Sequence, residues 1–143
     1  MKVISALFVL ALPCLLIADE AGVTLRITVS NIPGVKGNLL VGLFDSEKSF
    51  TKSPMAVSPK VKVVSTDDLV VEIPNVKPGT YAVSVVQDLN GNGKLDKSFV
   101  GMPKEPLAFS VIPEIPRGKP EFDDCSFAVG EEGVEMTISL VTR

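Results

Sequence analysis

The chain has no histidine and no tryptophan, and it contains only one tyrosine and two cysteines among its 143 residues. Without histidine, a Ser-His-Asp triad, a Cys-His pair, a His-ligated zinc ion and an imidazole proton shuttle are all impossible. These absences exclude most hydrolase and metalloenzyme mechanisms. The protein ligands that remain for a metal ion are mainly oxygen atoms, which favour a hard cation such as calcium.

Charge and length narrow the class of protein further. Fourteen Lys and Arg residues stand against 17 Asp and Glu residues, which gives a net charge of −3 and a pI near 5.0. The basic residues are scattered, whereas phosphate binding needs a concentrated basic surface, so we do not expect a nucleic-acid partner. A chain of this length is typical of a single domain.

The first segment has the pattern of an export signal. A lysine near the start is followed by an almost unbroken apolar run over residues 3–18, and polarity returns abruptly at Asp19. This pattern predicts a signal peptide over residues 1–18. The run is shorter than the ~20 residues of a membrane span, and no second apolar run follows it. We therefore expect an exported protein, periplasmic or extracellular, with no membrane span after cleavage.

The two cysteines have different expected fates. Cys14 lies inside the predicted signal peptide, and Pro13 before it and the apolar residues 15–17 after it do not favour lipidation. Removal of the signal peptide leaves Cys125 alone, so the exported chain would have no internal disulfide. Cys125 is expected to be a buried small hydrophobe rather than a reactive thiol.

The rest of the chain has the hydrophobic pattern of strands. Apolar side chains alternate with polar ones over residues 23–29 and again over 134–140, and residues 39–44 are apolar on both faces. Further β-rich segments cover residues 61–64, 69–73, 81–86 and 122–129. These patterns predict one domain over residues 22–143, an all-β, seven-stranded antiparallel sandwich of the immunoglobulin-like or transthyretin-like kind.

A long connection over residues 88–121 interrupts the regular spacing of strands. It contains five of the eleven prolines, at positions 103, 106, 113, 116 and 120. Connections longer than about 12–15 residues in a compact domain are usually functional or disordered. This segment is therefore where we look for a site.

The connection begins with a loop whose spacing suits calcium. Oxygen-bearing side chains occupy loop positions 1, 3, 5 and 9, and glycine occupies position 6, where a sharp bend is needed. The pattern resembles the calcium loops of EF-hand and dockerin proteins, but position 12 is Phe99 instead of glutamate. The predicted ligands are the side chains of Asp88, Asn90, Asn92 and Asp96, the backbone carbonyl of Lys94, and a carboxylate from Glu105.

Three hypotheses about function follow from this loop. In the first, the protein is a non-enzymatic binding or structural module with a calcium site, and its partner is an envelope protein or a polysaccharide. In the second, it is a metal-free structural or carrier sandwich, because Asn-Gly pairs are strong turn formers and Asp88 and Asp96 could bond the backbone. In the third and least favoured, Asp88, Asp96 and Glu105 serve a carboxylate-based hydrolase.

Several motifs together resemble one bacterial family. They are PGTYA over residues 78–82, DLNGNGKLD over 88–96, GMPKEP over 101–106 and the Phe-Ser pair at 109–110. In this order they resemble the secreted bacterial proteins classified as domain of unknown function 2141. The resemblance covers nearly the whole exported chain and implies a periplasmic or exported sandwich domain. It implies no activity.

Overall fold

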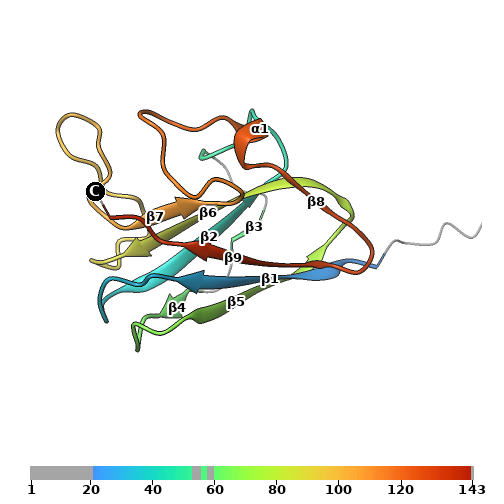
Figure 1. Cartoon of the computed structure of the whole chain (residues 1–143), viewed down its shortest axis with the longest axis horizontal. Helices are drawn as coiled ribbons and strands as arrows, with labels where there is room; N and C mark the ends of the chain where they lie inside the picture. The colour runs from blue at the N-terminus through green and yellow to red at the C-terminus, as the bar shows by residue number, and fades with distance from the viewer. Residues whose placement is uncertain (1–20, 53–55, 58–59, 143) are drawn as a thin grey trace, which may run out of the picture.

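The structure, a computed structural model, describes residues 21–52, 56–57 and 60–142. The predicted signal peptide over residues 1–18 lies outside the described residues. The described chain forms two β-sheets packed face to face, with one short helix (Figure 1). This confirms the prediction of an all-β sandwich, although the described residues form more strands than the seven predicted. Within the described ranges, none of the helical structure is long and apolar enough to cross a membrane.

The smaller sheet has three strands in the order β5-β1-β9, and β1 lies in its centre. These strands are β1 (Val23–Ser30), β5 (Leu69–Val76) and β9 (Val134–Ser139). Strand β1 pairs antiparallel with β5 but parallel with β9. The parallel pair departs from the purely antiparallel sandwich that the sequence predicts.

The larger sheet has six strands, and β2 and β6 form its long central pair. Its strands are β2 (Asn38–Phe44), β3 (Ala56–Val57), β4 (Val61–Lys62), β6 (Gly79–Asp88), β7 (Leu107–Phe109) and β8 (Phe127–Val129). All its pairs are antiparallel. Strand β6 ends at Asp88, so the candidate calcium loop begins at the end of a central strand of this sheet.

The main core lies between the two sheets. Leu25, Ile27 and Val29 from β1 are fully buried, as the period-two pattern predicts. Burying each such side chain contributes roughly 1.5–3 kcal/mol. The opposite sheet contributes Leu39, Val41, Leu43, Val83 and Val85. The core thus accounts for the face-to-face packing of the sheets.

A second apolar cluster covers the outer face of the larger sheet. Phe50 is fully buried at its centre, and its ring lies 5.4 Å from Phe44, 5.8 Å from Phe109 and 5.9 Å from Phe122, measured between centroids. Aromatic pairs at such spacings add stability beyond their buried area. Because both faces of β2 are covered, residues 39–44 are apolar on both sides.

The segment 122–129 differs from the single strand that the sequence predicts. Its first half is the helix α1 (Phe122–Cys125), and only β8 is extended. Glu121 and Asp124 cap the helix reciprocally, and Phe122 and Cys125, three residues apart, both face the second cluster. The expected connection 88–121 is likewise interrupted by β7, whose three residues are all buried.

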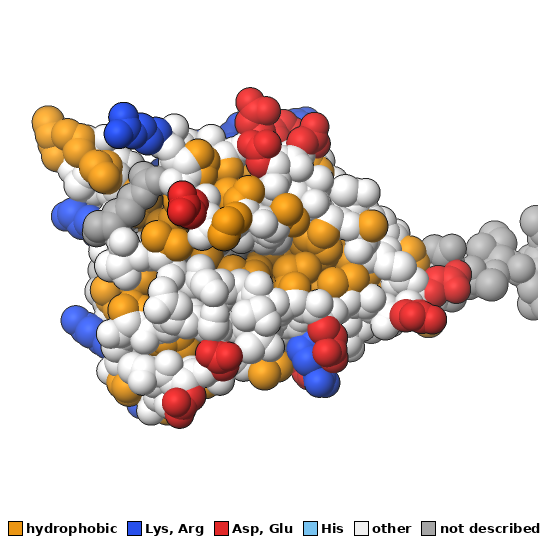
Figure 2. All heavy atoms as spheres, viewed as in Figure 1, with side chains coloured by type: hydrophobic (Ala, Val, Ile, Leu, Met, Phe, Trp, Pro, Cys, Tyr) orange, Lys and Arg blue, Asp and Glu red, His pale blue; other side chains and the backbone are white. Residues whose placement is uncertain are grey.

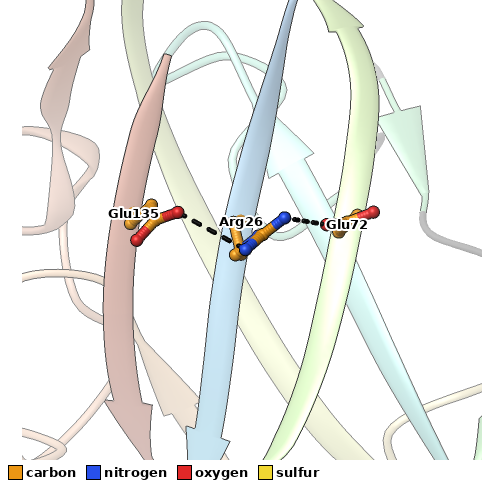
Figure 3. A network of polar contacts seen from close by, with 3 residues as sticks. All are labelled: Arg26, Glu72 and Glu135. Carbon is orange, nitrogen blue, oxygen red and sulfur yellow. Dashed lines mark ion pairs between the residues drawn. The ribbon is translucent and has the colours of Figure 1, made fainter.

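An ion-pair network crosses the exposed face of the smaller sheet (Figure 3). Arg26 on β1 is in register with Glu72 on β5 and Glu135 on β9. Its guanidinium nitrogens lie 2.7 Å from Glu72 Oε1 and 3.6 Å from Glu135 Oε1. All three side chains are at least half exposed, so the network adds little stability but favours this strand register.

Candidate functional site

The candidate loop is built around the carboxylate of Asp88, which is fully buried at the end of β6. Its Oδ1 accepts hydrogen bonds from the backbone N–H groups of Gly91 at 2.8 Å and Asn92 at 3.1 Å. Its Oδ2 accepts one from the N–H of Gly93 at 2.7 Å. Gly91 and Gly93 have φ of 74° and 77°, a conformation that glycine adopts without strain. The chain therefore wraps around this carboxylate.

At the other end of the loop, the carboxylate of Asp96 accepts hydrogen bonds from both asparagine side chains. Nδ2 of Asn90 donates to one of its oxygens, and Nδ2 of Asn92 donates to the other at 2.9 Å. The amide oxygens of the same asparagines accept backbone N–H groups, from Asn92 at 3.1 Å and from Lys94 at 2.9 Å. The two asparagines thus bridge the loop backbone and the Asp96 carboxylate.

Glu105 closes the loop at its base. This side chain is 5% exposed, and its two oxygens accept the backbone N–H groups of Leu89 at 2.8 Å and Asp96 at 3.0 Å. The N–H of Lys104 also donates to the backbone oxygen of Asp96 at 2.9 Å. The loop and the segment before β7 are therefore joined.

The structure brings together every side chain predicted as a ligand. Asp88, Asn90, Asn92, Asp96 and Glu105 all belong to one hydrogen-bonded loop, and Lys94 is exposed. In the described ranges, however, no three acidic or cysteine side chains approach closely enough to hold a metal by themselves. A cation here would also need the asparagine oxygens and backbone carbonyls.

Two residues that the sequence analysis missed support the base of the loop. Gln87 is fully buried, and its Nε2 donates to the backbone oxygens of Gly34 and Lys36, both at 2.8 Å. A Cβ atom on Gly37, which has φ of 72°, would lie 2.0 Å from the backbone oxygen of Asp88. These contacts join distant parts of the chain, and no local pattern reveals them.

A short hairpin extends beyond the loop. Lys97 and Pro103 form an antiparallel bridge at its base. Above it, the N–H of Ser98 donates to the oxygen of Met102 at 2.7 Å, and the N–H of Gly101 donates to the oxygen of Ser98 at 2.9 Å. The hairpin is thus ordered by its own backbone hydrogen bonds.

A cleft of about 620 Å³ lies between this hairpin and residues 115–120. Its volume is within the range of small-molecule binding sites. Lys119 on its wall donates to the backbone oxygen of Phe50 at 3.1 Å, with Nζ 5.3 Å from the centroid of the Phe50 ring. The lining is mainly apolar, from Leu95, Val100, Met102, Pro103, Leu107, Phe109, Ile115 and Pro120, with Thr51, Lys97 and Lys119 as polar members.

The nucleophilic side chains near β7 are held inside the protein. Cys125 is fully buried, and burial, with a smaller contribution from Asp124, raises the pKa of its thiol to about 11. Ser110 is also fully buried, and its Oγ accepts the N–H of Val83 at 2.8 Å and donates to the backbone oxygen of Cys125. Both side chains have structural surroundings rather than those of an activated nucleophile.

Together, these features define a small all-β sandwich with an ordered, hydrogen-bonded loop system at one end of its larger sheet. The model of a bacterial family described as "Uncharacterized protein conserved in bacteria (DUF2141)" matches residues 27–137. The chain belongs to this family, as its motifs predict. The match runs from β1 to β9 and includes the whole candidate loop. No curated protein and no solved structure matches the chain.

Proposed function

We propose that the protein is an exported, non-enzymatic binding module whose loop over residues 88–96 takes up a calcium ion. The observation that carries this proposal is that one hydrogen-bonded network joins the four oxygen-bearing side chains of the nine-residue loop and Glu105 at its base. Calcium prefers six to eight oxygen ligands, and the buried Asp88 carboxylate supplies negative charge at the loop's centre. The expected dissociation constant is about 10⁻⁴–10⁻³ M, as in extracellular modules.

Calcium would act by fixing the surface around the loop. The Asp96 backbone is bonded to Lys104 and Glu105, so a cation at Asp96 would also hold the hairpin that these residues flank. The mainly apolar cleft beside the hairpin then offers a site for a partner, an envelope protein or a polysaccharide. This arrangement supports a binding role at this end of the sandwich.

The environment of the polar side chains supports a non-enzymatic role. Both carboxylate oxygens of Glu105 accept backbone N–H groups, which leaves this side chain poorly placed to transfer a proton to a substrate. Ser110 and Cys125 are fully buried.

A second candidate function is a metal-free structural or carrier sandwich. One observation favours it: the loop's own hydrogen bonds are extensive. Asp88 accepts three backbone N–H groups, and Asp96 accepts both asparagine amides. Such a loop could be ordered by hydrogen bonds alone.

Calorimetric titration of the exported chain with calcium, after treatment with EDTA, separates the two candidates. The calcium proposal predicts saturable heat and a higher melting temperature, with about 2.7 kcal/mol of stabilisation at a hundredfold excess over the dissociation constant. Asp96→Asn should weaken binding at least tenfold, whereas Asp68→Asn, at an exposed turn, should not change it. No heat and no change in melting temperature at millimolar calcium would favour the metal-free candidate.

Export is tested separately by expressing the full chain in a Gram-negative host. The proposal predicts a periplasmic or secreted product whose first residue, determined by N-terminal sequencing, is Asp19. A cytoplasmic product that retains Met1 would contradict it.

A further inference from the structure

The hairpin tip, defined as residues 97–104, carries three exposed apolar side chains. Phe99 is fully exposed, with a relative exposure of 106%, and Val100 and Met102 are 76% and 47% exposed. A Cβ atom built on Gly101 would have no neighbour within 4 Å, so the turn at Gly101 is not packed against the rest of the protein, although Val100 and Met102 also border the cleft. Figure 2 shows hydrophobic side chains protruding where this loop extends in Figure 1, with basic side chains nearby.

The tip is positively charged although the whole chain is negative. Lys97 and Lys104 are exposed near its two ends, and residues 97–104 contain no acidic side chain. Two acidic residues flank the tip at the base of the hairpin: Asp96 accepts two asparagine amides, and Glu105 is buried on backbone N–H groups, whereas the two lysines are exposed. An apolar protrusion with cationic flanks therefore results.

We propose that this tip docks on an anionic lipid surface. Phe99, Val100 and Met102 would enter the boundary between headgroups and acyl chains, where burial of apolar area provides affinity. Lys97 and Lys104 would remain at the level of the headgroups, where each basic side chain is attracted by anionic lipid.

The size and shape of the tip favour lipid over a protein partner. A stable protein interface buries about 800 Å² on each side and involves 20–30 residues. The exposed apolar side chains here span only residues 99–102, and Val100 and Met102 among them also border the cleft, so a protein partner would need a pocket that matches a small surface. A bilayer accommodates such a protrusion without one, and its negative charge is complementary to the flanking lysines.

The tip is organised to act as a rigid unit. Its backbone is closed by the bonds between Ser98 and Met102 and between Gly101 and Ser98, and Lys104 ties its end to Asp96. Insertion would therefore require little additional ordering of the backbone. Because these bonds are made by the backbone of the tip and of Asp96, the inference goes beyond the proposed calcium function and does not depend on it.

Sedimentation with lipid vesicles tests this inference on the exported chain. We expect the protein to sediment with vesicles of phosphatidylglycerol and phosphatidylcholine in EDTA, to bind at least tenfold less to pure phosphatidylcholine, and to be released by 0.5 M NaCl. Absence of sedimentation with anionic vesicles would overturn the proposal, as would equal binding to both vesicle types.

Matched variants assign the binding to the tip. Phe99→Ser with Val100→Ser should lower the partition coefficient at least tenfold, whereas the control Val64→Ser, at a side chain 67% exposed elsewhere, should leave it unchanged. Lys97→Gln with Lys104→Gln should give a similar loss, and the exposed Lys36→Gln should not. Tip variants that bind like the unaltered chain would overturn the inference.

The experiments test the calcium proposal and the lipid-docking proposal independently of each other. The tip variants should keep the melting temperature and the calcium titration of the unaltered chain. Sedimentation in EDTA without any calcium heat would support lipid docking while contradicting the calcium function. Calcium heat without sedimentation would overturn lipid docking alone.

Discussion

Glu105 accepts a hydrogen bond from the backbone N–H of Asp96 at 3.0 Å, and its second oxygen accepts one from Leu89 at 2.8 Å. One buried carboxylate therefore joins the two ends of the loop that starts after β6. Hydrogen bonds to a charged group are worth about 1.5–3 kcal/mol, so Glu105 is a strong local constraint whether or not a cation is bound.

Replacing Glu105 with glutamine tests this constraint. In Glu105→Gln the side chain keeps its shape, but one of its two acceptors becomes an N–H₂ group facing a backbone donor. We expect the free energy of unfolding to fall by about 1–3 kcal/mol, measured by urea denaturation in EDTA. Glu114→Gln, at an exposed position, serves as the control and should change it by less than about 0.5 kcal/mol. Equal effects of the two changes would show that Glu105 does not hold the loop.

Asp88 supports a second prediction about the same loop. A surface turn residue changes stability by only a few tenths of a kcal/mol, but Asp88 is fully buried and accepts three backbone N–H groups. Asp88→Asn places an N–H₂ group opposite a backbone donor and removes the charge that the donors stabilise. Urea denaturation in EDTA should show a loss of about 1–3 kcal/mol, against less than about 0.5 kcal/mol for Asp68→Asn. A loss seen only with calcium present would instead assign Asp88 to the metal alone.

Local patterns predicted the strands, but not how distant strands pair. The period-two alternation over residues 23–29 and 134–140 identified β1 and β9, because alternation depends only on neighbours along the chain. Their parallel pairing brings together segments from opposite ends of the sequence, so no local pattern reveals it. Over residues 122–129, helix capping by Glu121 and Asp124 outweighed the β-rich composition.

In the candidate site, too, the local features could be predicted from the sequence, whereas the contacts between distant residues could not. The spacing of Asp88, Asn90 and Asn92 predicted a wrapped loop because turn geometry is local, and the structure shows these side chains bonded within one loop. Calcium binding by these residues stays a prediction. The contact of Gly37 with Asp88 links residues 51 positions apart, and the burial of Gln87 depends on the turn before β2, so neither follows from the loop's own sequence.

The contact at Gly37 gives a third prediction. A Cβ atom in Gly37→Ala would lie 2.0 Å from the backbone oxygen of Asp88, so the chain must move where the candidate loop begins. Gly118→Ala is the matched control, because Gly118 also has positive φ, 104°, but has no neighbour within 4 Å of the added atom. In the control, backbone strain should lower the free energy of unfolding by about 1–2 kcal/mol, and Gly37→Ala should lower it clearly more. Thermal denaturation of both variants makes the comparison, and equal losses would contradict the close approach.

The thiol of Cys125 gives a prediction about pH. Burial, and to a lesser degree Asp124, raises the pKa of this thiol from 9.0 to about 11 in the folded protein. Between about pH 9 and pH 11 the unfolded chain therefore loses a proton that the folded chain keeps, and the free energy of unfolding falls as the pH rises. Two pKa units correspond to at most about 2.7 kcal/mol.

Comparison with Cys125→Ala isolates this contribution, because the two proteins differ only at this side chain. The variant should be less stable at neutral pH, where it lacks the packed sulfur atom, but its stability should fall less steeply between pH 9 and pH 11. Urea denaturation at several pH values measures both slopes. Iodoacetamide provides an independent check, since a buried thiol with a raised pKa should react much more slowly in the folded protein than in urea. Parallel pH profiles together with rapid alkylation of the folded protein would show that Cys125 is accessible to solvent.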